Sequence, residues 1–344
     1  MNRLRALQQI GAVAGCSLFA LFLIDSAAFR TGLYSRMVAP DSYAGRFRAA
    51  IQGAAKVSPA GAKLVLVLGD SAMGEGFSAR IADQTAGHRV RFVNGAVPAA
   101  SIRTWFYLLR ELDPQRNRFS VIVLPVEGYD DEDGPWDRDD STNDVRLVVS
   151  ALHIGDVVEF TRSFRKWDAR WLAFRDVMLK GMVYRNDLRN FFSHPQQRLT
   201  EVQASEAHGS EWTYGYDGRN QDFDPASHEI QTMIHRPPSP QTGIYKEYRT
   251  YWLDKLVAPY AGKGTKFLIV RAPRNPVPIA RYARHDPRSS IRSLASRRNV
   301  VVADEHIFAD LEQIPYFFDA LHMNSAGRRL FSSRLAALVV ERFF

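Results

Sequence analysis

The sequence predicts an α/β protein built on a parallel sheet, and two observations support this fold class. Short, mainly apolar runs recur along the chain, and they end in residues typical of turns. Segments with helical periodicity separate several of these runs. Strands of a parallel sheet are buried on both faces and have this continuous apolar character, and helices form the crossovers between them. The five predicted strands lie at 64–68, 90–93, 121–124, 267–270 and 300–302.

The first apolar run ends in Gly69-Asp70-Ser71, and residues 72–84 can form a helix. Ser71 is therefore expected at the carboxyl edge of a strand and the amino end of a helix. Ligands of open α/β sheets bind at this edge, and helix N–H groups there favour developing negative charge. A serine so placed can act as a nucleophile. Alternatively, Asp70 or Ser71 caps the helix after a tight glycine turn.

The next elements follow the same alternation. The strand 90–93 ends at Asn94-Gly95, Ser101 caps a helix that continues to Leu112, and Pro125 closes the strand 121–124. Three strands that alternate with helices within so short a stretch imply βαβ crossovers and a parallel sheet.

The middle of the chain interrupts this alternation with an expected insertion at about 135–260. Residues 130–140 form an acidic loop whose spacing does not match a calcium-binding loop. Residues 154–192 have a basic, aromatic helical pattern, which is typical of core packing with a solvated face but also suits a helix resting on anionic lipid. Residues 193–242 are expected to be irregular. Their aromatic residues can stack on sugar rings or pack the loop; they are Trp212, Tyr214 and Tyr216.

The sheet pattern returns in the last third of the chain. A helix is predicted at 287–296 between the fourth and fifth strands. Near the end, Asp319 and His322 precede Asn324, which is expected to cap a helix that continues to about Arg342.

The N-terminus predicts a membrane anchor. Arg3 and Arg5 precede an apolar stretch from Ile10 to Ile24, and residues 1–30 as a whole fit an uncleaved signal-anchor. Two alternatives are a cleaved signal, with Ser26-Ala27-Ala28 as the processing site, and a lipoprotein signal around Cys16. Residues 31–62 are expected to be a linker with an amphipathic piece at 43–51. Residues 63–344 are the expected catalytic domain, on the periplasmic or extracellular side of a single-pass anchor.

Composition limits the classes of partner. The formal net charge of +8 favours anionic surfaces, but Lys and Arg are scattered and form no module typical of DNA or RNA binding, so no nucleic acid is expected. The single cysteine, Cys16, excludes an intrachain disulfide and the cysteine-rich zinc sites. We expect neither a metal nor another cofactor.

Three residues suggest nucleophilic catalysis. A serine hydroxyl needs a base, and a histidine serves best when a carboxylate orients it. Asp319 and His322 are three residues apart and can face the same sheet edge as Ser71, just ahead of the final helix.

The order strand, Gly-Asp-Ser, helix and late Asp-x-x-His resembles the SGNH (GDSL-type) hydrolase superfamily. The resemblance implies a three-layer α/β/α sandwich with a flavodoxin-like sheet and a triad of Ser71, His322 and Asp319. It also implies an oxyanion hole formed by Ser71, Gly95 and the residue at position 130. Residues Gly128-Tyr129-Asp130-Asp131 match a block in which the family has Gly-x-Asn-Asp, so Asp130 replaces a hydrogen-bond donor by an acceptor.

Within this superfamily, the chain resembles the membrane-anchored proteins that acylate envelope polysaccharides. That resemblance implies a serine esterase or O-acyltransferase acting on an acylated carbohydrate, with acetyl as the expected acyl group and a membrane-bound O-acyltransferase as a potential partner. The alternatives are a catalytically inactive polysaccharide assembly or binding protein, suggested by Asp130, and a lipase or phospholipase.

Overall fold

The computed structural model describes residues 3–58, 61–131, 141–208, 242–274, 286–319 and 321–344. The chain divides into two compact units. Residues 1–48 and 145–207 form the helical unit, and residues 49–144 and 208–344 form the sheet unit.

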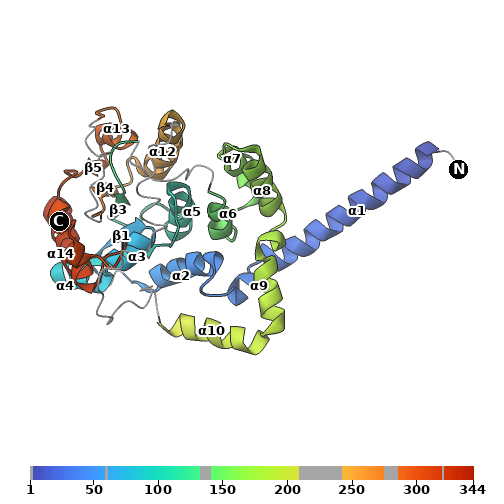
Figure 1. Cartoon of the computed structure of the whole chain (residues 1–344), viewed down its shortest axis with the longest axis horizontal. Coiled ribbons are helices and arrows are strands. Elements are labelled where there is room, and N and C mark those ends of the chain that lie inside the picture. Colours follow the sequence, from blue (N-terminus) through green and yellow to red (C-terminus); the bar gives the residue numbers. More distant parts are fainter. Residues whose placement is uncertain (1–2, 59–60, 132–140, 209–241, 275–285, 320) are drawn as a thin grey trace. The chain divides into compact units, whose positions relative to one another are not determined.

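The sheet unit contains a five-stranded parallel sheet with the strand order β2-β1-β3-β4-β5 (Figure 1). The strands are β1 (Lys63–Gly69), β2 (Val90–Ala96), β3 (Val121–Val126), β4 (Lys266–Arg271) and β5 (Val300–Val302). In this register the inner strand β1 pairs Leu66 with Val93 of β2 and with Ile122 of β3. The all-parallel α/β fold expected from the apolar runs is therefore confirmed.

Both faces of the sheet are buried, which explains why its strands are apolar at consecutive positions. On one face, Val65 and Val67 belong to a core cluster with Phe77, Phe331 and Leu335. These partners come from the segment after β1 and from the last helix, α14 (Ser325–Phe343). On the other face, the side chains of alternate strand residues are equally buried, namely Leu64, Leu66, Leu68, Ile122, Leu124, Phe267 and Ile269.

Helices of the sheet unit begin where local capping groups satisfy their free N–H groups. The Ser101 side chain accepts from Thr104 N at the start of α5 (Ile102–Leu112), and the Asn324 side chain accepts from Ala326 N at the start of α14. Helix α12 (Thr242–Val257) contacts α5, where the Trp252 ring lies 5.4 Å from that of Phe106. Other helices described in this unit are α2 (Tyr43–Lys56, shared with the helical unit), α13 (Ser290–Ser293) and the short 3₁₀ turns η4 (Ala258–Tyr260), η6 (Leu294–Ser296), η7 (Ala309–Leu311) and η8 (Ile314–Tyr316).

The helix expected at 72–84 is broken into α3 (Ser71–Gly76) and α4 (Ala79–Thr85). The chain turns between them because Phe77 is fully buried in the core cluster. Ser78 then begins the second helix: its backbone N–H donates to Ser332 Oγ at 2.9 Å, and its side chain caps α4. Helices α4 and α14 lie side by side (Figure 1).

The helical unit surrounds the C-terminal end of α1 (Arg3–Phe29). Its small core contains Tyr34, Val38, Val149 and Tyr184, and the Phe29 ring stacks on that of Tyr184 at 5.3 Å. The other elements are η1 (Tyr34–Met37), α6 (Asn143–Val148, at the boundary), η3 (Ile154–Asp156), α7 (Val157–Arg162), α8 (Trp167–Met178), α9 (Gly181–Ser193) and α10 (Pro195–His208).

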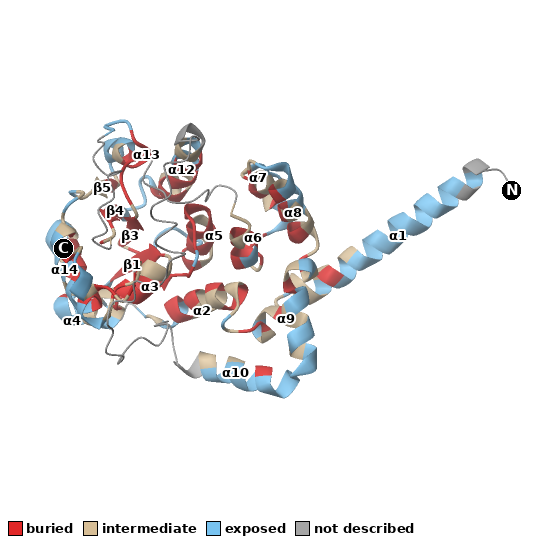
Figure 2. Cartoon of the chain, viewed as in Figure 1, coloured by how far each residue is buried: buried red, intermediate tan, exposed pale blue. Residues whose placement is uncertain are grey.

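Helix α1 has one stretch, Leu7–Phe29, that is long and apolar enough to cross a membrane by length and composition. Figure 2 shows this helix as almost wholly exposed up to its C-terminal turns. The structure thus has the N-terminal apolar helix that the sequence predicts.

Two segments carry more helix than the sequence suggests. Residues 195–208, expected to be irregular, form α10, which starts with Pro195 at its first position, where proline loses no hydrogen bond. Arg198 holds this helix by donating to Asp187 Oδ1 at 3.0 Å and to Met37 O at 3.1 Å. The expected linker 31–62 contains η1 and the 14-residue helix α2.

Candidate active site

Ser71 lies where strand β1 turns into helix α3. The Asp70 side chain caps that helix by accepting from Ala72 N at 3.0 Å, so the capping role considered from the sequence is present. The turn requires glycine at position 69, because a Cβ there would lie 2.2 Å from the Met73 Cβ. Ser71 itself is half-buried, and its hydroxyl faces the C-terminal segment of the chain.

His322, which lies 251 residues further along the chain, contacts this hydroxyl, and Asp319 contacts His322. His322 Nε2 lies 3.0 Å from Ser71 Oγ, and His322 Nδ1 lies 2.8 Å from Asp319 Oδ2. Because Nδ1 faces a carboxylate, it carries the proton, which leaves Nε2 of the neutral ring free to accept one from the serine. The structure therefore brings the three residues together in the order that a nucleophile, a base and an orienting acid require.

Asp319 also shapes the loop that presents the histidine. Its Oδ1 accepts from the backbone N–H of Leu321 at 2.7 Å and from that of His322 at 2.8 Å. One carboxylate oxygen thus holds the backbone while the other holds the imidazole, and both side chains are only about a tenth exposed (11% and 12%). Asn324 then starts α14 directly after the loop.

The electrostatics suit proton transfer. Burial acts to lower the pKa of His322, but the hydrogen bond and charge of Asp319, with smaller effects of Asp70 and Glu75, outweigh it and raise the pKa above its ordinary value. Burial acts to raise the pKa of Asp319, but the hydrogen bonds and charge of His322, together with the backbone N–H of Leu321, outweigh it and lower the pKa. Asp319 therefore stays ionised and stabilises a protonated His322.

Gly95 does not lie at the rim of the site. It sits inside β2, paired with Leu68 of β1, and Val97 two residues later donates its N–H to Gly69 O at 3.0 Å. Since alternate N–H groups of a strand point the same way, the Gly95 N–H is directed into the β1–β2 ladder. This position does not support the expectation that the Gly95 N–H helps to hold an oxyanion. Packing explains why position 95 is a glycine, because a Cβ there would lie 2.8 Å from a methyl group of Leu66.

The turn that follows β2 was not singled out from the sequence. It is closed by a hydrogen bond from Ala100 N to Val97 O at 3.0 Å, and Ala99 has φ +61°, a conformation that favours glycine. With Pro98 before it, the turn has the features of type II. Ala99 is exposed. Strained backbone of this kind gathers at functional sites, and Pro98 is the local signal that could have indicated it.

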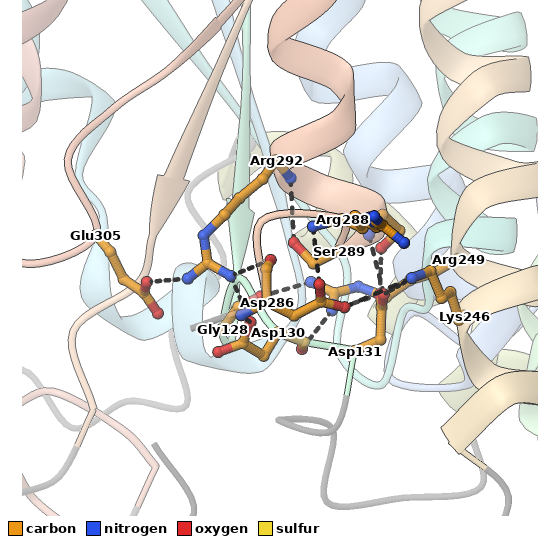
Figure 3. Close-up of polar contacts among 11 residues, drawn as sticks. Gly128, Asp130, Asp131, Lys246, Arg249, Asp286, Arg288, Ser289, Arg292 and Glu305 are labelled. Carbon is orange, nitrogen blue, oxygen red and sulfur yellow. Dashed lines mark hydrogen bonds and ion pairs between the residues drawn. The ribbon is translucent and has the colours of Figure 1, made fainter. Parts of the chain in front are cut away.

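Asp130 belongs to a buried polar cluster at the end of β3 (Figure 3). Its carboxylate accepts from Asp286 N at 2.9 Å and pairs with the Arg292 guanidinium, which also holds Glu305 at 2.6 Å. The side chain therefore acts as an acceptor for a fixed cation. This arrangement does not fit the oxyanion role that the family resemblance implied for position 130.

The neighbouring Asp131 extends this cluster to α12. It accepts from Ser290 N at 2.9 Å and lies 3.4 Å from Arg249 Nη1, and Arg249 in turn donates to the backbone oxygen of Asp130 at 2.8 Å. Figure 3 shows these side chains converging from α12, from α13 and from the loop after β3. Asp130 and Asp131 thus connect the loop after β3 with α12 and with α13, which is a structural role.

The remaining predicted site residues, Trp212 and Tyr214, lie outside the described residues. Among the residues that are described, no group of three or more His, Cys, Asp or Glu side chains is arranged to hold a metal ion. No protein-family model matches the sequence, and no curated protein matches it.

Proposed function

We propose that the protein is a membrane-anchored serine esterase or O-acyltransferase that acts on acyl esters, with acetyl as the expected group, of a cell-envelope carbohydrate. The observation that carries the proposal is the continuous pair of contacts from Ser71 Oγ to His322 Nε2 and from His322 Nδ1 to Asp319. The choice of carbohydrate rests on the resemblance to the SGNH hydrolases alone.

We also propose the three-layer α/β/α sandwich of that superfamily for the sheet unit, with the helical segments as an insertion. Burial of both sheet faces and the strand order 2-1-3-4-5, which is that of flavodoxin-like sheets, support this arrangement. The catalytic unit is placed on the periplasmic or extracellular side, with α1 as its single-pass anchor.

In the proposed reaction, Ser71 Oγ attacks the acyl carbonyl carbon while His322 Nε2 takes the hydroxyl proton. Asp319 stabilises the resulting imidazolium. When the tetrahedral intermediate collapses, the carbon–oxygen bond to the alcohol breaks and Nε2 returns the proton to the leaving oxygen. His322 Nε2 then removes a proton from water, or from a sugar hydroxyl, whose oxygen attacks the acyl carbon. The bond from that carbon to Ser71 Oγ breaks, and Nε2 returns the proton to Oγ. Water as acceptor makes an esterase, and a sugar hydroxyl makes a transferase.

The oxyanion requires donors other than Asp130. We assign this role to the N–H of Ser71 and to that of Ala99 in the turn after β2. The Ser71 N–H lies at the start of α3, and the Ala99 turn leaves the same carboxyl edge of the sheet, one strand away. Such a donor contributes roughly 3 to 4 kcal/mol of transition-state stabilisation.

The test is labelling by a fluorophosphonate serine probe together with hydrolysis of a short-chain aryl ester. Wild type is expected to react, whereas Ser71→Ala is expected to lose labelling and at least about 10³-fold in turnover while its thermal unfolding is unchanged. Ser296→Ala, which alters an exposed serine of η6, is the matched control and should behave as wild type. Unchanged turnover of Ser71→Ala would remove this serine from the mechanism.

The same assay separates the alternatives. A non-catalytic polysaccharide-binding protein would retain glycan binding, and its wild-type form would not be labelled. A lipase would prefer long-chain over short-chain esters. Acceleration of product release by an added carbohydrate acceptor would identify a transferase.

A further inference from the structure

Helix α8 presents an aromatic face to solvent. Trp167 is 78% exposed, Trp171 57% and Phe174 39%. The spacing of four and three residues places the three side chains on one side of the helix, and the rings of Trp171 and Phe174 stack at 5.7 Å. The buried residues Ala169, Ala173 and Asp176 lie on the opposite side. The aromatic face is therefore not the side by which α8 packs into the protein.

The segment that precedes α8 also exposes apolar side chains. Ile154 of η3 is 52% exposed and Val158 of α7 is 60% exposed, and α7 packs directly against α8. We call the five side chains together the α7–α8 face; they are Ile154, Val158, Trp167, Trp171 and Phe174. Several exposed apolar side chains on two packed helical elements are typical of a surface that contacts another phase or another molecule.

The end of α1 is fixed to the end of α8. Arg30 donates to Val177 O at 2.6 Å and to Met178 O at 3.0 Å, which satisfies carbonyl groups of the last turn of α8. Asp25 of α1 accepts from Lys180 N at 3.0 Å and from Gly181 N at 2.7 Å, at the start of α9. The junction between α8 and α9 is thus bound to the last turns of α1.

Asp25 also indicates where a membrane span would end. Its carboxylate is buried against the protein, so the apolar length available to lipid runs from Leu7 to Ile24. At 1.5 Å per residue this stretch is about 27 Å long, close to the hydrocarbon thickness of a bilayer. The α8–α9 junction therefore lies at the point where α1 would leave the hydrocarbon. In Figure 2 the exposed sides of α7 and α8 face the side along which α1 extends.

The charge of the helical unit favours an anionic surface. Its residues 1–48 and 145–207 hold 16 Lys and Arg against 9 Asp and Glu, a difference of +7, although the whole chain has only +8. Tryptophan prefers the headgroup level of bilayers, because its apolar ring and polar N–H suit both sides of that boundary.

We propose that the α7–α8 face rests in the interface of the same anionic bilayer that α1 spans. The helical unit then contacts the membrane at two places, a span and a lateral face, and this restricts the tilt of the unit on the membrane surface. The inference rests on the anchorage in the proposed function and is independent of the chemistry of Ser71.

The experiment uses the full chain in vesicles of phosphatidylglycerol and phosphatidylethanolamine with nitroxide-labelled lipid as a quencher. An environment-sensitive fluorophore is attached to one cysteine at a time. The first site is the native Cys16 in α1. The others are Trp171→Cys and, as a matched control, Leu199→Cys, each in a Cys16→Ser background. Leu199 is a 47% exposed apolar residue of α10 in the same unit.

Quenching at position 171 is expected to be about threefold or more that at position 199 and to approach that at Cys16. Quenching at Cys16 with none at 171 would overturn the docking inference and leave the anchor in place. No quenching at Cys16 would overturn the anchor and the docking together. A blue-shifted fluorophore at 171 that lipid does not quench would indicate a protein contact, such as a second copy, and would also overturn the inference. Labelling of Ser71 by the serine probe is measured separately, so a failure of the catalytic proposal remains distinguishable.

Discussion

The two units of the chain differ in how they meet their surroundings. Of the 21 large hydrophobic side chains that are exposed among the described residues, 17 belong to the helical unit, and 9 of these lie outside α1. The helical unit also holds nearly all of the net charge, whereas the larger sheet unit is close to neutral. Among the described residues, exposed apolar side chains are therefore concentrated in the helical unit, which also has most of the positive charge.

The residues proposed for catalysis and those proposed for membrane contact lie in different units. All three residues of the candidate triad belong to the sheet unit, and the candidate membrane contacts belong to the helical unit. The following predictions test whether catalysis depends on the sheet unit alone and how each unit is stabilised.

The largest effect is expected from Asp319→Asn. The amide has no charge to stabilise the imidazolium, and it favours the tautomer that carries the proton on Nε2, which then cannot accept the serine proton. Turnover of an aryl ester should therefore fall by about 10³- to 10⁴-fold, as in other triads. Steady-state kinetics with wild type and Ser71→Ala as references provide the measurement. A loss smaller than about tenfold would show that chemistry does not depend on this carboxylate.

The second-largest effect expected is the loss of stability when a buried ion pair of the sheet unit is broken. The Asp144 carboxylate binds Arg103 at 2.7 Å, and neither side chain is exposed. Asp144→Ala leaves the buried guanidinium without its counter-charge, which should lower the free energy of unfolding by about 3 to 5 kcal/mol. The control is Asp310→Ala, whose pair with Arg334 is about half exposed (55% and 45%) and should cost no more than about 1 kcal/mol. Equal losses in chemical denaturation would contradict this difference.

The pH profile tests the site itself. The base must be neutral, and the pKa of His322 is raised, so kcat/KM should decline as the pH falls through a midpoint above the ordinary value of about 6.5, by about tenfold per pH unit below it. Removal of the Asp319 charge should move this midpoint to lower pH, which the residual activity of Asp319→Asn can report. A midpoint below the ordinary value in wild type would be inconsistent with the pairing.

The smallest effect concerns the helical unit. Asp25→Ala removes the acceptor for the first N–H groups of α9 and should lower the stability of this unit by about 1 to 2 kcal/mol. Faster proteolysis within the helical unit in detergent would report it, with aryl esterase activity unchanged. Asp41→Ala, at an exposed position of the same unit, is the control. If both variants are cleaved at the wild-type rate, α1 is not an integral part of the unit.

Local patterns were sufficient to predict most of the sheet unit. The strands are mainly apolar runs, and Ser101 and Asn324 mark helix starts by side chains that act on the next turn. The break at Phe77 and the helix α10 were not predicted, because both depend on distant partners such as Ser332 and Asp187. The ion pairs of Asp130 and Asp131 join segments more than 100 residues apart, which no local signal could indicate.

The sequence by itself determined the parallel α/β class, the apolar N-terminal helix and the residue types available for a serine mechanism, because periodicity, capping and short motifs act over a few residues. Only the tertiary structure decided that Ser71 meets His322, that Gly95 is held within the sheet, and that the end of α1 packs with residues 145–207. Those outcomes depend on contacts between residues far apart in the chain, whose free energies arise only when the segments pack together.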